Sequence, residues 1–390
     1  MRQKIYDASF ALLPLMLFFE SKWMAWLILV WGALALVRAE TLRQNASREA
    51  GLYPMLLLLL AWPLVTSLWS ISPPATLDMW LRIAVMFLCG AVALVSPVSR
   101  PLPPKLLVWM VILAALSLLV LLVAMLPPVK PLLMRWGISL PVLLIITADR
   151  AMCAFSVMVW PLAAGLQRIG ERRLACGLVV LAAMAVGLLH SLSAMLGFTV
   201  GLLSWGLVCL LPVSGAWLLM ILAPLVVAVG PFAVDWFVHL PFTPAQLGLL
   251  QSLSSGRLLI WQGLVDAGAG HPLLGWGMQA SRLLKLTSAQ LGTMHMDATP
   301  LHPHCSVLQV WLELGLVGLV LYASAVALML RTVAARLRGN PELALGMAAV
   351  MAYLGAEFSS FSIWQNWWAA LPWIVLVVWR RLPPAASSAS

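Results

Sequence analysis

The sequence predicts an all-α, polytopic membrane protein with about twelve transmembrane helices and one large external loop. Of its 390 residues, 63% are hydrophobic and only 9% are charged, a composition that ordinary soluble domains do not reach. Apolar runs of roughly 15–25 residues recur along the chain, and each is long enough to cross a bilayer as a helix. Many of the 20 tryptophans stand near the ends of these runs, where aromatic side chains mark the membrane interface.

The apolar runs define the expected spans in chain order. We expect them at residues 6–19, 23–37, 52–69, 79–96, 106–126, 151–166, 174–190, 194–211, 216–232, 305–330, 343–359 and 368–379. The first nine spans fill residues 1–232, a loop with amphipathic helices takes up 233–304, and the last three spans and a short tail occupy 305–390. The first run resembles a signal peptide, but no small-residue cleavage site follows it, so we expect an uncleaved helix.

Basic residues are distributed unequally between the two sides of this arrangement. The N-terminus, the loops 38–51, 97–105, 167–173 and 331–342, and the tail share one side and hold 15 of the 23 lysines and arginines. Because positively charged loops stay in the cytoplasm, both termini are expected there and the 233–304 loop on the opposite face. The net charge of +10 therefore reflects topology, and no nucleic-acid partner is predicted.

Two stretches do not fit a simple span. Residues 127–150 contain several prolines and end at Arg150, so a membrane-edge or re-entrant segment on the outer face is expected rather than a thirteenth span. The loop at 233–304 is too long for a connector, and loops of such length are usually functional. Five cysteines, an odd number, indicate no disulfide framework. Cys305 stands beside His304, which is weak evidence for a thiol nucleophile.

The stretch from Ser254 to Gly318 gathers four of the six histidines and several basic residues. Within it, Arg257 follows a serine–glycine cap and opens an amphipathic helix with Trp261 and Leu264 in its apolar stripe. An arginine in the first turn opposes the helix dipole, but beside free N–H groups it makes a good anion site. The alternative is an arginine that snorkels to the membrane interface.

His304 is the candidate general base. It follows Pro303, a residue favoured in a first helical turn, and is expected to begin the span that continues through Trp311. A histidine at a helix N-terminus tends to be neutral, the form that a base needs. It is alternatively a polar interfacial residue, or a metal ligand with His295 and His302, although zinc-type spacings are not clear. His302 should tolerate substitution better, because residues i and i+2 do not share a helix face.

The sequence lacks the usual groups that hold phosphates with a metal. The outer loops have no Asp-x-Asp pair, and the chain has no Walker motif and no Gly-x-Ser-x-Gly elbow. An anionic leaving group on the outer face would therefore need arginine or lysine. The candidates are Arg82, Arg135, Arg150, Arg257, Arg282 and Lys285.

Three blocks in this order resemble the bacterial O-antigen ligase and O-antigen polymerase superfamily. They are Ser-Gly-Arg-Leu-Leu-Ile-Trp at 255–261, His-Pro-Leu-Leu-Gly-Trp-Gly at 271–277 and His-Pro-His-(x)3-Leu-Gln-(x)3-Glu-Leu-Gly-Leu-(x)-Gly at 302–318. The resemblance is sharp over residues 255–318. The plan of about twelve spans with one large periplasmic loop late in the chain extends it over most of the protein.

The resemblance implies an inverting, metal-independent glycosyltransferase, an O-antigen ligase, which needs no cofactor and faces the periplasm from the bacterial inner membrane. Its donor would be a glycan on undecaprenyl pyrophosphate and its acceptor a sugar hydroxyl of lipid A–core, among membrane lipids. By the motif match, Arg257 corresponds to the family's pyrophosphate-binding arginine and His304 to its essential histidine. The expected substrate-binding residues are Arg150, Arg282, Lys285 and His302.

The chain departs from the family pattern at one position. The family often carries Ser-Arg-Gly-Ala at the outer end of a middle span, whereas residues 191–194 read Ser-Leu-Ser-Ala, with Leu192 in place of arginine. We expect Arg150 to substitute, because a lone arginine at a membrane edge usually has a function. Alternatively, Asp149 and Arg150 form an interfacial anchor, or the donor or the activity differs.

Two other functions stay open. A polymerase would use the same chemistry, with a second lipid-linked glycan as the acceptor. A transporter or flippase would need paired repeats and ionisable residues near the bilayer midplane. No repeat is evident, and Glu313 and Glu357 are the charged residues nearest to a midplane position.

Overall fold

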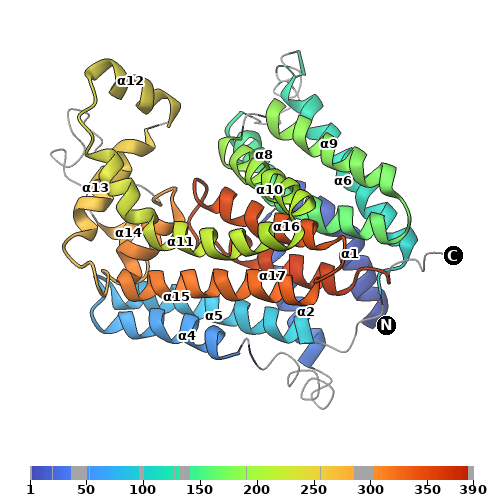
Figure 1. Cartoon of the computed structure of the whole chain (residues 1–390), viewed down its shortest axis with the longest axis horizontal. Helices are drawn as coiled ribbons and strands as arrows, with labels where there is room; N and C mark the ends of the chain where they lie inside the picture. Colours follow the sequence, from blue (N-terminus) through green and yellow to red (C-terminus); the bar gives the residue numbers. More distant parts are fainter. Residues whose placement is uncertain are drawn as a thin grey trace.

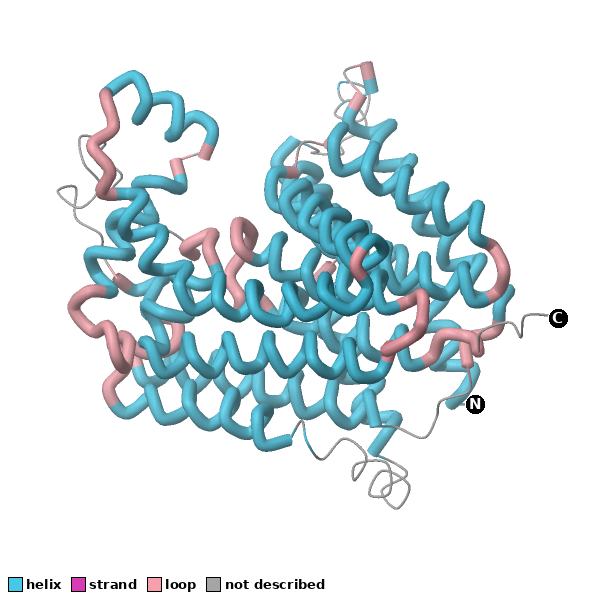
Figure 2. Tube along the Cα trace, viewed as in Figure 1, coloured by secondary structure: helices cyan, strands magenta, loops and turns pink. Residues whose placement is uncertain are grey.

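The computed structural model describes most of the chain as helices. It covers residues 2–19, 21–36, 51, 53–95, 101–126, 128, 129, 131, 135, 141–189, 191–254, 256–284 and 302–384. These residues form helices, turns and coil, and no strand is present among them (Figure 2). The predicted all-α class is confirmed for this part of the protein.

Each of the twelve predicted spans overlaps a helix of the structure. These helices are α1 (Arg2–Phe19), α2 (Trp23–Leu36), α4 (Tyr53–Val65, continued by the 3-10 turn η2 at Thr66–Leu68), α5 (Pro73–Val95), α6 (Pro104–Met125), α8 (Pro141–Arg168), α9 (Arg172–Leu188), α10 (Leu192–Leu210), α11 (Pro212–Val238), α15 (Ser306–Arg336), α16 (Leu343–Glu357) and α17 (Asn366–Arg380). The predicted loop contains α12 (Pro244–Leu253), α13 (Arg257–Gly268) and α14 (Ala280–Leu283).

Five helices of the described part are long and apolar enough to cross a membrane, judged by length and composition. They are α5, α6, α10, α11 and α15. The protein is therefore a helical membrane protein, while the count of twelve crossings and the side that each loop faces stay predictions.

Figure 1 shows how the helices are arranged. Helices α4, α5, α11, α15 and α17 run along the long axis, and α6, α8, α9 and α10 cross them at a slant (Figure 1). The start of α1 and the end of α17 lie toward one end, and α12, α13 and α14 lie at the other (Figure 1). The side of the membrane that each end faces stays a prediction.

Small residues allow α10 and α16 to pack closely together. Helices α10 and α16 meet where Gly197 faces Ala352 and Ala356, and a Cβ on Gly197 would lie 2.7 Å from the Cβ of Ala356. Without a hydrophobic driving force in lipid, such close backbone approach supplies much of the packing energy. This pair fixes the start of α10 beside the end of α16.

Helix α8 is longer than predicted. It begins at Pro141 and runs without a break to Arg168, so Asp149 and Arg150 lie inside a 28-residue helix. The helix therefore begins ten residues before the predicted span at 151–166, while the placement of residues 141–150 at the membrane edge stays a prediction. Most of residues 127–140 lie outside the described residues.

Helix α15 is broken and folds back on itself at Gly315. The backbone of Gly315 has φ 67° and ψ −168°, a conformation accessible essentially only to glycine. The Ser306 side chain hydrogen-bonds with Tyr322, whereas a straight helix would separate these residues by about 24 Å along its axis. The predicted span 305–330 therefore contains a short helix to Leu314, a reversal, and a second helix that continues to Arg336.

Candidate active site

Arg257 is the first residue of α13, as predicted. Gly256 before it has a left-handed backbone, with φ 79°, and no side chain caps the helix. The start of α13 is held in place by buried Leu258 and by Trp261, whose Nε1 donates a 2.9 Å hydrogen bond to the carbonyl of Pro303. This bond connects the arginine helix to the segment that carries the histidines.

His302 and His304 lie in the coil before α15 and not in its first turn. The helix begins at Ser306, and His304 has φ 52°, an uncommon left-handed conformation for a residue other than glycine. The two imidazole rings contact each other, with centroids 4.0 Å apart. The prediction that they occupy different faces of one helix is therefore wrong, because neither residue is helical.

Burial and neighbouring charges keep both imidazoles neutral. Burial, followed by the charge of Arg257, lowers the pKa of His304 to about 4, although a hydrogen bond with the backbone of Ser360 acts in the opposite direction. Burial also lowers the pKa of His302 to about 3, with further contributions from His304, Arg282, Arg257 and Arg150. The neutral state predicted for His304 is thus supported, but its main cause is burial rather than a helix dipole.

Three polar atoms near these rings have no hydrogen-bond partner among the described residues. They are Nε2 of His302, Nδ1 of His304 and Nε of Arg150, and all three are buried. A buried polar atom without a partner costs about 1–3 kcal/mol. These atoms therefore mark a place that a polar ligand would stabilise.

Helix α8 brings Asp149 and Arg150 to the same place. Asp149 accepts a hydrogen bond from the hydroxyl of Ser191 and lies near enough to Arg257 and Arg150 to interact with both charges. The guanidinium carbon of Arg150 is 5.8 Å from the centroid of the Phe361 ring, which lies 6.2 Å from the ring of His302. Arg150, Arg257 and the histidines thus share one carboxylate and one aromatic neighbour.

The remaining predicted ligands are less enclosed. Arg282 lies on α14 and is exposed, yet its charge contributes to the low pKa of His302. Lys285 and His295 lie outside the described residues. Of the six predicted site residues, the structure therefore brings together His302, His304, Arg257, Arg150 and Arg282.

Leu192 is the first residue of α10 and is 49% exposed. Its neighbours hold the start of α10 at the site. Ser191 caps the helix, and the Ser193 hydroxyl donates a 2.7 Å hydrogen bond to the carbonyl of Ser359. These two contacts hold the start of α10 near Asp149 and the segment after α16.

Glu313 is a buried organising residue that the sequence motifs did not assign to the site. Its carboxylate accepts hydrogen bonds from the backbone of Gln279 at 2.8 Å, the side chain of Gln309 at 3.2 Å and the indole of Trp364 at 2.5 Å. It also accepts from the backbone and hydroxyl of Ser281. This single side chain joins the 271–284 segment, α15 and the connection between α16 and α17.

The second and third sequence blocks pair with each other through their backbones. The amides of Trp276 and Gly277 donate to the carbonyls of Leu312 and Glu313, both at 2.9 Å. Beyond the break, the amide of Leu316 donates to the carbonyl of Pro272, also at 2.9 Å. The glycines of both blocks are needed because a Cβ on Gly275 would lie 2.5 Å from Glu313, and one on Gly315 would lie 2.2 Å from the carbonyl oxygen of Leu273.

The described residues contain no group of three or more histidine, cysteine or carboxylate side chains placed to hold a metal ion. His295 is outside this part of the chain, so independence from metal stays a prediction. Cys305 is 2% exposed at the start of α15, which gives its thiol little contact with an incoming substrate.

Part of the chain is similar to known proteins. Residues 177–323 match the family described as O-antigen ligase. A protein of Rickettsia felis named "Putative polysaccharide ligase" is 26% identical over 243 residues, which make up 60% of this chain and 58% of that protein. A similarly named protein of Rickettsia conorii is 26% identical over 243 residues, covering 60% and 57% of the two chains.

This part of the chain is therefore similar to O-antigen ligases and to proteins named polysaccharide ligases. The matched region contains Arg257, Arg282, the two histidines and Glu313, whereas Arg150 precedes it. A shorter match, to a polysaccharide ligase-named protein of Rickettsia bellii, is 30% identical over 129 residues, 32% of this chain and 31% of that one. The alignments thus span less than two thirds of these relatives.

Within the matched region, the first block supplies Arg257 at a helix start, and the third block supplies His302 and His304. The second block and the remainder of the third hold the broken helix together. The three blocks therefore combine the predicted site residues with residues that maintain the backbone around them.

Proposed function

We propose that the protein is an O-antigen ligase that transfers a glycan from undecaprenyl pyrophosphate to a sugar hydroxyl of lipid A–core. The observation that carries the proposal is the placement of three arginines around two neutral, touching histidines. Guanidinium groups suit the pyrophosphate of the donor, since they form paired charge-assisted hydrogen bonds with phosphate oxygens. A neutral imidazole suits an acceptor hydroxyl.

In the proposed step, the acceptor oxygen attacks the anomeric carbon and the bond from that carbon to the pyrophosphate oxygen breaks. The electron pair of this bond leaves with the pyrophosphate, whose charge Arg257 and Arg150 offset. The hydroxyl proton passes to His304. Its Nδ1 has no partner among the described residues, and a proton on Nε2, directed at the backbone of Ser360, would leave Nδ1 as the acceptor.

The starts of α10, α13 and α15 add to the positive potential. These three helix N-termini lie around one region. Ser191 and Arg257 both interact with Asp149, and His304 interacts with Ser360 and with the charge of Arg257. Helix N-termini carry a partial positive charge and favour anions. The arginines and the helix dipoles therefore act in the same direction.

We further propose that the site faces the periplasm and that both termini are in the cytoplasm of a bacterial inner membrane. The unequal distribution of basic residues supports this orientation. The placement of the start of α1 and the end of α17 at the end away from α12, α13 and α14 also supports it (Figure 1).

The proposal is tested with the purified full-length protein, the lipid-linked glycan donor and lipid A–core, with products resolved by gel and mass spectrometry. Transfer to lipid A–core is expected for the wild type and for Arg82→Ala, whose arginine is exposed and paired with Asp78 at 2.9 Å. Longer lipid-linked glycans in the absence of lipid A–core would instead identify a polymerase. No glycosylated product with either acceptor would contradict both functions.

A further inference from the structure

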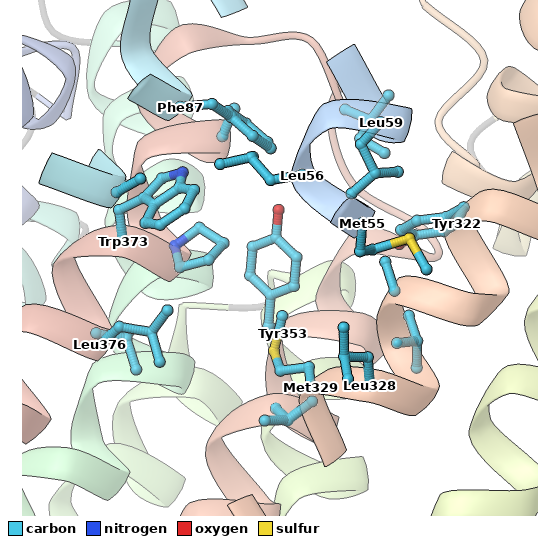
Figure 3. Close-up of a pocket in the computed structure, with 18 of the residues that line it drawn as sticks. Met55, Leu56, Leu59, Phe87, Tyr322, Leu328, Met329, Tyr353, Trp373 and Leu376 are labelled. Atoms are coloured by element: carbon cyan, nitrogen blue, oxygen red, sulfur yellow. The ribbon is translucent and has the colours of Figure 1, made fainter. Parts of the chain in front are cut away.

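A large apolar cavity lies between α4, α5, α15, α16 and α17. Its volume is about 490 Å³, within the range of about 300–1,000 Å³ that is usual for ligand sites. Figure 3 shows Leu56, Phe87, Met329, Tyr353 and Trp373 arranged around the space. The proposed transferase chemistry does not use it.

The charges along this cavity are few and unevenly placed. Among the described residues that line it, the charged ones are Arg336, Arg380 and Glu357. Glu357 is 1% exposed and accepts hydrogen bonds from Tyr322, from Tyr353 at 3.1 Å and from the Trp368 indole at 3.3 Å. Its charge is therefore already accommodated by three donors.

The two arginines lie at the end remote from the histidines. Arg336 ends α15 and Arg380 ends α17. Ser306, two residues after His304, hydrogen-bonds with Tyr322, and the helix from Tyr322 to Arg336 is about 21 Å long at 1.5 Å per residue. A lipid with its phosphate at Arg336 is therefore distinct from a donor with its pyrophosphate at Arg257.

We propose that this cavity binds one hydrocarbon chain of an anionic glycerophospholipid, with the phosphate-bearing head group at Arg336 and Arg380. An apolar wall suits the chain, and the two guanidinium groups complement the negative head group. Basic pockets between transmembrane helices are typical binding sites for anionic lipids on the cytoplasmic side.

Such a lipid would support the part of the protein that shapes the active site. Tyr353 lines the cavity and bonds to Glu357, the last residue of α16. The following residues include Ser360 and Phe361, which contact the histidines. Binding of the anionic lipid is therefore expected to raise the unfolding temperature, because a ligand that prefers the folded state stabilises it.

The first test measures phosphatidylglycerol and phosphatidylcholine binding to the full-length protein by native mass spectrometry, without any glycan donor. Arg336→Gln/Arg380→Gln should bind phosphatidylglycerol roughly 30-fold more weakly, from about 1 kcal/mol per arginine. The matched control is Arg331→Gln/Arg338→Gln, which removes two exposed charges from the same end but outside the cavity lining. Equal loss in both double variants would overturn the proposal.

The second test fills the cavity. Ala325→Trp, at a lining position, should abolish both the bound phosphatidylglycerol and the rise in unfolding temperature that this lipid causes, whereas Ala327→Trp, outside the lining, should retain both. The proposal of an anionic-lipid site would be overturned if the wild-type protein bound phosphatidylcholine as strongly as phosphatidylglycerol. It would also be overturned if a polyprenyl phosphate displaced the phosphatidylglycerol. None of these readouts depends on glycan transfer, so a failure of the proposed function would leave this result interpretable.

Discussion

The guanidinium group of Arg257 stands at a helix start, near Asp149 and the histidine pair. Arg257→Ala should lower the rate of glycan transfer by about 10²–10³, the usual cost of losing one group that stabilises developing charge. Arg257→Lys should restore only part of it, because an ammonium lacks the paired donors of guanidinium. The measurement is single-turnover transfer beside Arg82→Ala, and near-wild-type rates for the alanine variant would remove Arg257 from the site.

The low pKa of His304 predicts an unusual pH dependence. Since burial lowers it to about 4, the ring stays neutral through the physiological range, and kcat/KM should fall only as the pH approaches that value. The His304→Gln variant should lose most of its activity, and its remaining kcat/KM should no longer fall near pH 4. If kcat/KM instead falls near pH 6.5, the base in the free enzyme is not the buried His304 imidazole.

Protonation also affects folding, so the same buffers need an unfolding measurement. Both histidines have lower pKa values in the folded protein than the ordinary 6.5. The unfolded chain therefore binds more protons below pH 6.5, and the stability present above that pH is lost as the pH falls toward about 4 and then 3. Activity lost before unfolding begins would be attributable to protonation of His304, the proposed base.

Arg150 is predicted to bind the donor rather than to act on the acceptor. Arg150→Gln should raise the KM for the donor by about tenfold, the effect of about 1.4 kcal/mol, because one charge-assisted contact is lost. Asp149→Asn should lower that KM, since it removes a negative charge beside the phosphate. Steady-state kinetics with varied donor checks both, and a change in acceptor KM alone would contradict this role.

At the level of elements, Gly315 and Gly275 connect two helices and a loop through close backbone contacts. Gly315→Ala should destabilise the protein by about 1–3 kcal/mol or more, since the new Cβ would lie 2.2 Å from the Leu273 carbonyl oxygen. Thermal unfolding in detergent measures this, with Gly206→Ala as the control because nothing lies within 4 Å of that position. Equal unfolding temperatures for the two variants would show that the reversal tolerates a side chain.

Hydropathy could predict the helices but not the shape of α8 and α15. Apolar runs predict membrane helices well, since every backbone polar group in lipid must be paired within the helix. Hydropathy cannot reveal the reversal at Gly315, because residues 306–314 and 316–330 are both apolar and form one continuous run. Likewise, prolines suggested an irregular segment before Arg150, whereas the structure extends α8 back to Pro141.

At the level of the whole molecule, the site assembles from residues that are distant in sequence. Motifs predicted Arg257 and His304 because these lie in recognisable blocks. Arg150 was predicted only from its place at the edge of a span and from the leucine at position 192, where an arginine was expected. No sequence pattern predicted Asp149, and Glu313 was recognisable only as a carboxylate within an apolar run. Spatial convergence of α8, α10, α13 and α15 explains why these residues needed the structure.

The overall balance of charge around the site leads to a prediction about metals. Arginines and helix starts, rather than a metal, are proposed to offset the pyrophosphate charge, so transfer by the purified protein should continue in excess EDTA. Activity lost in EDTA and restored by Mg²⁺ or Zn²⁺ would contradict this and return attention to His295, which lies outside the described residues. Arg257→Ala serves as the inactive reference in the same assay.

The reversal at Gly315 also has a consequence for how the protein is made. The insertion machinery sorts segments by hydrophobicity, so it should accept residues 305–330 as one continuous membrane helix. The Leu273 carbonyl and the Trp276 amide, already synthesised, must then engage this helix before it can bend. We expect maturation to end with this rearrangement inside the membrane, and a chain that fails at it to be full-length, inserted and unable to bring His304 beside Ser360.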